Sequence, residues 1–433
     1  MQQVKVRILL YFFLSLLFIL PVNAQSVDSL VNEALQNNPQ LKAMQEKIKS
    51  AEYKSEGAGF LPPPTVGIEF SQIPLEDANP FTKALSQSIS VSQMFMPGGK
   101  LSAMKDAERK GISVAEKEYE TYRLKLRAGV KSKYFEIWMM EHHIGLRDEI
   151  IALLNNLLQS TEQLYVTGSA KYSDILMIKA ELAANKTQLE VLENDISASV
   201  YEMNAILGRD LNNDELAVSH TWKTDPTAYS AEELVEVLGS SNPELQRMEE
   251  MIEMNRLQIT ANNKELIPDF MLQGMIMRMP QGMILTSKSP VHALDGMGDT
   301  EYMYSIMASV TLPFMPWSSG KITAREEELT AAISGLSSEK YDMQRRMISE
   351  LRGLLKKLES ERKKIKLYSD EVIPLYRQAL EAQVSEFQNA RTSINDLINT
   401  MQMLLMKEEE MAEAQMQHEM ILAEIESIAG SEL

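Results

Sequence analysis

The chain has 433 residues, of which 61 are acidic and 43 are basic, and its formal net charge is −18. This acidic balance argues against nucleic acid and anionic lipid head groups as partners, because both repel negative charge. The chain has no cysteine, which excludes disulfides, thiolate metal ligands and a cysteine nucleophile.

The first 24 residues have the pattern of an export signal. Lys5 and Arg7 precede a run at 8–20 that is apolar except for Ser15, and a small-residue cleavage site follows. The run is shorter than the roughly 20 residues that span a bilayer. We therefore expect a signal peptide over 1–24, with an uncleaved anchor as the alternative. No later stretch predicts a transmembrane helix.

The rest of the chain repeats one pattern. The segment from Tyr165 to Asp174, with its small-residue break, returns 222 positions later as the segment from Phe387 to Asp396. Self-similarity over a half-chain predicts a duplicated structural unit. Two other motifs also recur: Pro97-Gly-Gly-Lys100 as Pro316-Trp-Ser-Ser-Gly-Lys321, and Asn38-Pro39 as Asn242-Pro243.

Each copy predicts the order helix, strand, loop, strand, long helix and return helix. In the first repeat, over 25–214, we expect strands at about 65–73 and 85–96, a long helix over 101–164 and a return helix over 174–207. A polar linker over 215–240 follows. In the second repeat, over 241–433, we expect strands at about 269–279 and 302–313, a long helix over 321–386 and a return helix over 396–428.

The strands have one apolar and one polar face. Val66, Ile68 and Phe70 alternate with polar or small residues, and the other strands follow the same rule. Segments of about ten such residues have the length of transmembrane β-strands. Four strands are too few to close a barrel, and an open edge in lipid leaves backbone groups unpaired. Three chains together would supply twelve strands. The alternative is a pair of hairpins packed on a soluble helical domain.

The two long helices are not typical of a compact enzyme. A helix over 101–164 would be roughly 95 Å long at about 1.5 Å per residue, whereas globular helices average about 12 residues. Its apolar residues recur at spacings of three and four, as in Ile150, Leu153, Leu154 and Leu157. This periodicity predicts coiled-coil packing of long antiparallel helices.

With this order of elements, the Pro-Gly-Gly-Lys turn and the repeated break, the chain resembles the TolC-type outer-membrane efflux protein family over almost all of its mature length. The resemblance implies an α+β membrane protein with a duplicated helix-strand-strand-helix unit. It implies a homotrimer whose 12-stranded β-barrel lies in the outer membrane of a Gram-negative bacterium and continues as a long periplasmic α-helical barrel. It also implies two partners, a periplasmic adaptor (membrane fusion) protein and an inner-membrane pump of the RND or ABC type.

By this resemblance, the two breaks are the periplasmic helix tips. In the first tip, Gly168, Ser169 and Ala170 stand where the family contacts its adaptor. In the second tip, Ala390 stands where the family usually has glycine, and Arg391 follows it. By the same resemblance, Ala390 and Arg391 are the adaptor contacts of the second tip.

The resemblance also points to a periplasmic gate. Asp396 falls where the best-known member closes its tube with a ring of aspartates, Asn399 replaces a second aspartate, and Asp174 is the equivalent in the first repeat. Converging carboxylates repel one another and attract cations, as a selective constriction requires. The alternative is that Asp174 and Asp396 are helix N-caps, where aspartate is favoured.

No catalytic or cofactor-binding motif is present, so we expect neither enzymatic activity nor a cofactor. The methionines, 29 in number, stand out instead. Thioethers suit Cu(I) and Ag(I), which predicts weak transit contacts rather than a fixed metal site. The alternatives are that methionine is a flexible filler or faces lipid. The candidate residues lie in the third and fourth strands: Met271, Met275, Met277, Met303 and Met307.

These observations predict a passive outer-membrane exit channel of a tripartite efflux or type I export system. Heavy-metal efflux of the copper or silver type is one candidate role among drugs, small organic molecules and polypeptides. The competing hypothesis is a periplasmic coiled-coil scaffold or adaptor without a pore.

Overall fold

The structure is a computed structural model that describes residues 25–73, 75, 79–211, 216, 218, 230–279, 283–286, 289–292, 300–389 and 391–431. The predicted signal peptide therefore lies outside the described residues. The chain forms two compact units, and each unit contains segments of both sequence repeats. The helical unit comprises the segments up to Gln45, Lys117–Gln246 and Asp342–Leu433, and the strand unit comprises Glu46–Glu116 and Arg247–Tyr341.

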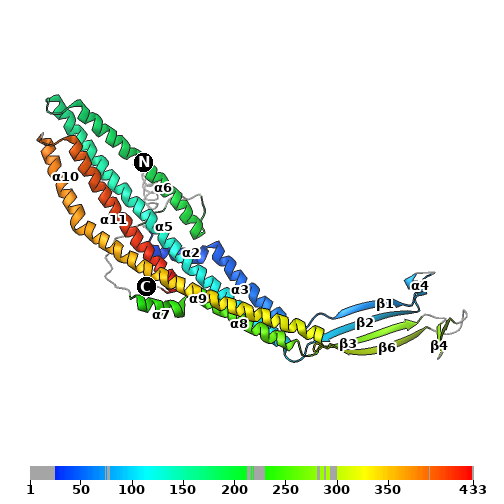
Figure 1. The fold of residues 1–433 in the computed structure, drawn as a ribbon. Coiled ribbons are helices and arrows are strands. Elements are labelled where there is room, and N and C mark those ends of the chain that lie inside the picture. Colours follow the sequence, from blue (N-terminus) through cyan, green and yellow to red (C-terminus); the bar gives the residue numbers. More distant parts are fainter. Residues whose placement is uncertain are drawn as a thin grey trace, which may run out of the picture. The chain divides into compact units, whose positions relative to one another are not determined.

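The strand unit contains a four-stranded antiparallel sheet (Figure 1). Its order is β1 (Thr65–Ser71), β2 (Ser86–Phe95), β3 (Phe270–Met279) and β6 (Glu301–Val310). The two repeats join where β2 pairs with β3, with Ser88 opposite Met277 and Met94 opposite Met271. The short helix α4 (Pro80–Lys83) lies between β1 and β2 in the chain, and a second pair of strands, β4 (Met283–Thr286) and β5 (Ser289–His292), lies between β3 and β6.

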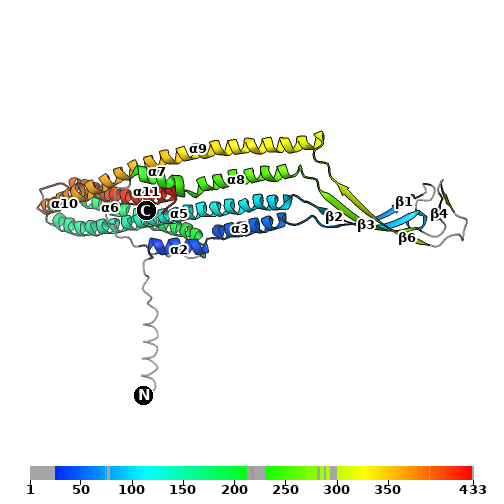
Figure 2. The ribbon, with the colours of Figure 1, turned by 90° about the horizontal axis from the view of Figure 1, so that it is seen from below.

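Each strand of the sheet is next to a long helix in the sequence: a helix precedes β1 and β3, and a helix follows β2 and β6. These helices are arranged in the same order as the strands. Figure 2 shows α3 (Pro39–Ala58), α5 (Lys100–Val166), α8 (Pro243–Lys264) and α9 (Pro316–Leu367) as successive neighbours in a row. Ion pairs join each helix to the next. They are Lys54–Glu108 at 2.8 Å, Lys110–Glu250 at 2.7 Å and Lys340–Glu249.

The turn between β2 and α5 requires glycine. Gly98 and Gly99 have φ angles of 75° and 73°, a region that other residues rarely adopt. A Cβ atom on Gly98 would also collide with the side chain of Ile267. Directly after the turn, Lys100 is 1% exposed, and its Nζ lies 2.7 Å from Oδ1 of Asp269 at the start of β3. The Pro-Gly-Gly-Lys motif therefore fixes a buried contact between the two repeats.

The helical unit packs two antiparallel helix pairs (Figure 1). The end of α5 runs against α6 (Tyr172–Leu207), and α10 (Ile373–Gln388) runs against α11 (Ile394–Ala429). A core cluster that includes Leu154, Ile178, Leu397 and Leu404 joins these pairs, as the spacing of apolar residues predicts. None of the helices in the described part of the chain is both long and apolar enough to cross a bilayer.

The Asn-Pro motif has the same role in both repeats. Asn38 lies between α2 (Val27–Asn37) and α3, and its Oδ1 accepts hydrogen bonds from the first backbone N–H groups of α3 while its Nδ2 donates to the carbonyl of Ile206 at 2.8 Å. Asn242 repeats this arrangement at the start of α8, with its Nδ2 donating to the carbonyl of Ile428 at 2.8 Å. In each repeat the asparagine therefore accepts hydrogen bonds from the free N–H groups at the start of one helix and also donates a hydrogen bond to the return helix.

The second long helix differs from the single helix expected over 321–386. It begins earlier, at Pro316, and α9 ends at Leu367, where a π-helical turn spans Tyr368–Val372 before α10 begins. The cause is Pro374, which has no N–H and whose ring cannot pack against a regular preceding turn. The wider turn accommodates the proline, and the N–H of Ile373 donates to the carbonyl of Tyr368 instead.

The expected linker over 215–240 is also partly wrong. Its end forms the helix α7 (Ala231–Ser241), which begins after the N-cap Ser230, whose Oγ accepts a hydrogen bond from the N–H of Glu233. Leu234 and Leu238 bury one face of α7 against a cluster that includes Leu351. The short amphipathic pattern is therefore enough to form a helix once α9 and α11 cover it.

Candidate functional site

The register of the sheet sorts its side chains into two chemically different faces. Because Ile68 lies opposite Ile89, and Ile89 lies opposite Ile276, the apolar residues of successive strands fall on one face. We call this the apolar face. Its members are Val66, Ile68, Phe70, Gln87, Ile89, Val91, Gln93, Phe95, Phe270, Leu272, Gly274, Ile276, Arg278, Tyr302, Tyr304, Ile306, Ala308 and Val310.

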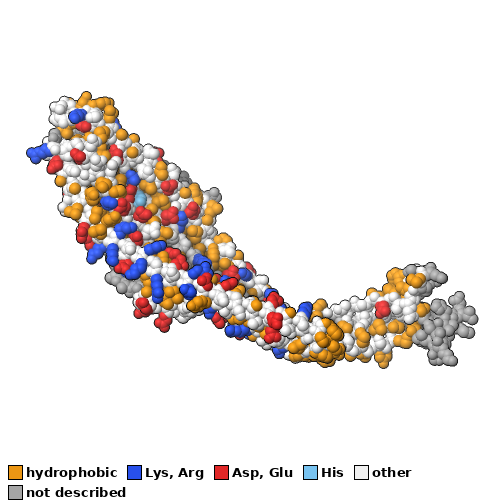
Figure 3. Space-filling model, in the orientation of Figure 1, with side chains coloured by type: hydrophobic (Ala, Val, Ile, Leu, Met, Phe, Trp, Pro, Cys, Tyr) orange, Lys and Arg blue, Asp and Glu red, His pale blue; other side chains and the backbone are white. Residues whose placement is uncertain are grey.

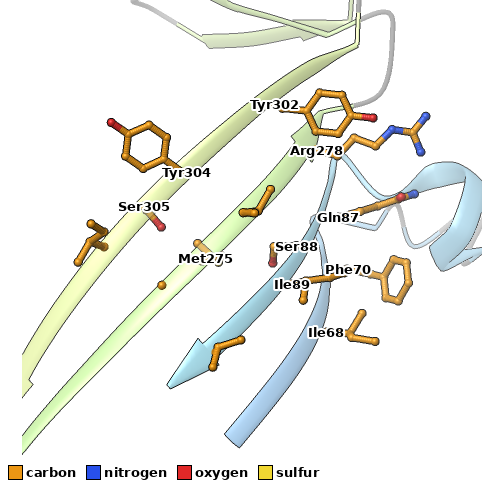
Figure 4. A pocket seen from close by; sticks show the side chains of 14 residues that line it. Ile68, Phe70, Gln87, Ser88, Ile89, Met275, Arg278, Tyr302, Tyr304 and Ser305 are labelled. Carbon is orange, nitrogen blue, oxygen red and sulfur yellow. The ribbon is translucent and has the colours of Figure 1, made fainter. Parts of the chain in front are cut away.

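The apolar face is largely uncovered within the chain. Ile68 is 69% exposed, Ile276 is 63% exposed and Ile306 is 73% exposed. A groove of about 700 Å³ follows this side of the sheet, and Figure 4 shows Ile68, Phe70 and Ile89 among the side chains that line it. A continuous exposed apolar surface of this kind marks contact with a membrane or another protein.

Aromatic residues stand at both ends of the apolar face. Phe60, Phe314 and Trp317 are exposed where the strands meet the helices, and Figure 3 shows hydrophobic side chains gathered there. Phe81 and Tyr302 are exposed at the other end of the strands. Two aromatic rims with an apolar band between them are typical of membrane-spanning strands.

The opposite face of the sheet carries serine and methionine, and we call it the Ser/Met face. Ser88, Ser90 and Ser92 of β2 lie opposite Met277, Met275 and Gln273 of β3. All five methionines singled out in the sequence lie on this face: Met271, Met275, Met277, Met303 and Met307. The described residues contain no group of three or more histidine or acidic side chains arranged to hold a metal ion.

The two helix breaks lie together in the helical unit and share one groove. The groove has a volume of about 560 Å³, and both turns line it. Gly168 turns the first break with a φ of 77°, and Gly168 and Ser169 are exposed while Ala170 is half-buried. Ala170 lines the groove, as does the exposed Arg391 of the second break. Ala390 lies outside the described residues.

The groove brings together the two aspartates singled out in the sequence. Asp174 and Asp396 both line it, together with Lys171 and Arg391. The groove therefore combines two carboxylates with two cations at its surface. The third candidate gate residue, Asn399, lies one turn further along α11 and is exposed.

Neither aspartate is a helix N-cap. Asp174 is the third residue of α6, and its Oδ2 accepts a hydrogen bond of 3.0 Å from the backbone N–H of Lys171. Asp396 is the third residue of α11, where Ser393 is the N-cap and donates a hydrogen bond of 2.6 Å from its Oγ to Asp396. Both carboxylates lie in the first turn, where the helix dipole favours negative charge.

The helical unit contains ion pairs and a half-buried carboxylate that the sequence alone did not predict. Arg147 pairs with Glu409 at 2.6 Å, and Arg377 pairs with Glu408. Among the described residues, no cation is paired with Glu141, and burial raises its pKa to about 7 against a weaker opposing effect of a hydrogen bond from the backbone of Val218. Isolated charges on a long helix give no sequence signal for such pairing, because their partners come from distant segments.

Comparison with known proteins identifies the fold. Residues 30–209 match the family model described as outer membrane efflux protein. No curated protein sequence shows significant similarity to the chain.

Solved structures share the fold over most of the chain. The outer-membrane channel OprN has a TM-score of 0.73 and 14% identity, with 94% of this chain and 90% of OprN covered. CusC, described as a protein that folds into a transmembrane channel, has a TM-score of 0.73 and 14% identity, with 94% and 93% covered. The outer membrane protein VceC of Vibrio cholerae has a TM-score of 0.71 and 16% identity, with 94% and 96% covered. The chain therefore matches the outer membrane efflux protein family over residues 30–209 and shares the fold of these solved proteins over most of its length.

Proposed function

We propose that the protein is a passive exit channel in the outer membrane, in which three copies form one 12-stranded barrel. The observation that carries this proposal is the exposed apolar face of the sheet. Burying a side chain such as isoleucine is favourable by about 1.5 to 3 kcal/mol, so an uncovered face of this size needs an apolar environment. The bilayer core provides one.

The sheet also needs partners at both edges. β1 and β6 are the outermost strands of the sheet, and within the described part of the chain each pairs with a strand of this sheet on one side only. In lipid each unpaired group costs several kcal/mol, so a spanning sheet must close. Pairing β6 of one copy with β1 of the next closes the sheet, and three copies supply the number of strands that the family uses.

The dimensions of the strands fit this role. β3 has ten residues and alternates in exposure along its length. At about 3.4 Å per residue, tilted by about 40°, such a strand spans roughly the 25 Å apolar band of an outer-membrane barrel. The aromatic rims then lie at the two interfaces, and the Ser/Met face lines the water-filled interior.

The shared groove at the helix breaks supports a role for the tips in gating and docking. Asp396, Asn399 and Asp174 are the candidate gate residues. Gly168, Ser169, Ala170, Ala390 and Arg391 are the candidate contacts with a periplasmic adaptor. The mixed charges of the groove suit a polar partner, and Asp396 is exposed and thus free to approach its copies near a threefold axis.

An inner-membrane pump of the RND or ABC type supplies the energy in this proposal, since the chain carries no nucleotide-binding motif. The competing scaffold hypothesis gives no reason for an exposed apolar band between aromatic rims. The channel hypothesis explains the apolar band and the aromatic rims together, because a lipid bilayer would contact both.

The test is the behaviour of the mature chain. We expect it to fractionate with outer membranes, to run as a heat-labile trimer in mild detergent and to give ion conductance in planar bilayers. Recovery as a monomer in the soluble periplasm, with no affinity for detergent micelles, would contradict the proposal.

A further inference from the structure

The methionines of the sheet all lie on the Ser/Met face and not on the apolar face. Within β1, β2, β3 and β6, seven methionines occur, and every one belongs to the Ser/Met face. Methionine is an apolar residue, so a sheet with one apolar face normally carries it on that face. The residues are Met94, Met271, Met275, Met277, Met279, Met303 and Met307.

The register places these methionines in a continuous row. Met277 lies opposite Met303, and Met94 lies opposite Met271. Met275 lies opposite Ser305, so it is diagonal to both Met303 and Met307. Directly opposite Cβ atoms are about 5 Å apart and diagonal residues about 7 to 8 Å apart, within reach of the long methionine side chain.

The row, which we call the methionine ladder, therefore runs along most of the sheet without a gap. Its steps are Met277, Met303, Met275, Met307, Met271 and Met94, each opposite or diagonal to the next, and Met279 extends it beyond Met277.

The thioethers are accessible. Met303 is 37% exposed and Met307 is 48% exposed, and the other five are half-buried. The same face carries the carboxylate of Glu69, and the described side chains on it include no lysine or arginine. The surface around the ladder therefore attracts cations.

We propose that the methionine ladder is a transit path for soft monovalent metal ions, Cu(I) or Ag(I), through the barrel. Thioether sulfur is a soft ligand that selects Cu(I) over the hard ions of the medium. Neighbouring methionines can share one ion, and a row of weak sites lets an ion enter and leave, as conduction requires. The inference rests on the proposed channel function, because only that function places the Ser/Met face in the interior.

The experiment compares three full-length proteins. The ladder variant combines Met271→Leu, Met275→Leu, Met277→Leu, Met303→Leu and Met307→Leu, which keeps size and apolarity but removes the sulfur. The control variant combines the same substitution at four exposed helical methionines: Met104, Met177, Met403 and Met406. Since the chain has no cysteine, no thiolate competes for the metal.

Two measurements are made. Equilibrium dialysis of the detergent-solubilised proteins against silver nitrate without chloride measures the bound silver. Planar-bilayer recordings with silver added measure the block of current. We expect wild type and control to bind silver and to show brief silver-dependent blocks, and the ladder variant to lose at least half of the bound silver and most of the blocks.

Equal silver binding by the ladder variant and wild type would overturn the inference, as would a wild-type channel that conducts but shows no response to silver. Absence of conductance in all three proteins would contradict the proposed channel instead. The dialysis result would then still decide whether the ladder binds the metal.

Discussion

Nζ of Lys100 lies 2.7 Å from Oδ1 of Asp269, in a site where the lysine is 1% exposed and the aspartate side chain 14% exposed. Lys100 begins α5 in the first repeat, and Asp269 precedes β3 in the second. Glu265 adds a second carboxylate, with its Oε2 at 3.4 Å from the same Nζ. This buried pair joins the two repeats at the place where sheet and helices meet.

Replacing Lys100→Met should destabilise the protein. The change leaves the carboxylate of Asp269 without its cation, and breaking a buried pair on one side costs about 3 to 5 kcal/mol. We expect a lower thermal midpoint for loss of the proposed trimer on mild-detergent gels. The control is Lys321→Met, because Lys321 occupies the matching motif of the second repeat but is exposed. An equal effect of both substitutions would show that the buried pair is not what matters.

Asn38→Ala and Asn242→Ala should have similar effects, because the two asparagines make the same contacts. Each change removes the cap of a helix and leaves a carbonyl of the return helix, at Ile206 or Ile428, without its donor. We expect a loss of about 1 to 2 kcal/mol for each, measured by chemical denaturation. Asn37→Ala, at an exposed neighbouring position, is the control. A large effect at only one of the two motifs would contradict their equivalence.

The charge of Asp396 should control conductance if the carboxylates of three copies meet near the axis. Asp396→Asn keeps an acceptor for the hydroxyl of Ser393 and removes the charge. We expect higher single-channel conductance and weaker block by divalent cations. The asparagine side chains of the three copies carry no charge, so they neither repel one another nor attract cations into the constriction. Asp195→Asn, at an exposed position far along α6, is the control. Conductance and block that match wild type would exclude a ring at Asp396.

Glu141 should make the helical unit less stable as pH rises. Its pKa is about 7 in the folded protein against an ordinary value of 4.5, because burial disfavours the charged form. Between these values the unfolded chain releases its proton first, so stability falls with rising pH and the loss is complete above about pH 7.

Glu141→Gln removes this dependence while keeping an acceptor for the backbone of Val218. We expect the variant to melt at a higher temperature than wild type at about pH 8 and at the same temperature at about pH 3, where both states are protonated. Thermal melts followed by circular dichroism over this range are the measurement. If the melting temperatures of the variant and the wild type differed by the same amount at all pH values, titration of Glu141 would be ruled out as the cause.

Local patterns were enough to predict the strands and the order of elements. Alternation in Val66, Ile68 and Phe70, and the repeated Asn38 and Asn242 motifs, depend on neighbours in the sequence, so they can be interpreted without a structure. The π-helical turn before Pro374 could not be predicted as such, because a proline predicts an interruption and not how the chain accommodates it.

Long-range pairs were beyond prediction for a different reason. The partners Lys100 and Asp269 lie 169 positions apart, and no local pattern links them. At the helix tips, the sequence marked Asp174 and Asp396 separately, but the groove that holds both depends on how two helix pairs pack. The methionines of β3 and β6 could be assigned to one face of each strand, whereas their continuous row depends on the register between strands.

The most direct test of the account is a cysteine scan of β3 in outer membranes, which the cysteine-free chain makes possible. Single variants such as Met271→Cys, Leu272→Cys, Gln273→Cys, Met275→Cys and Ile276→Cys are exposed to a water-soluble maleimide that does not enter lipid. A barrel whose Ser/Met face lines the pore predicts labelling at 271, 273 and 275 and protection at 272 and 276. Uniform labelling, or labelling of the apolar face alone, would contradict a barrel whose Ser/Met face lines the pore.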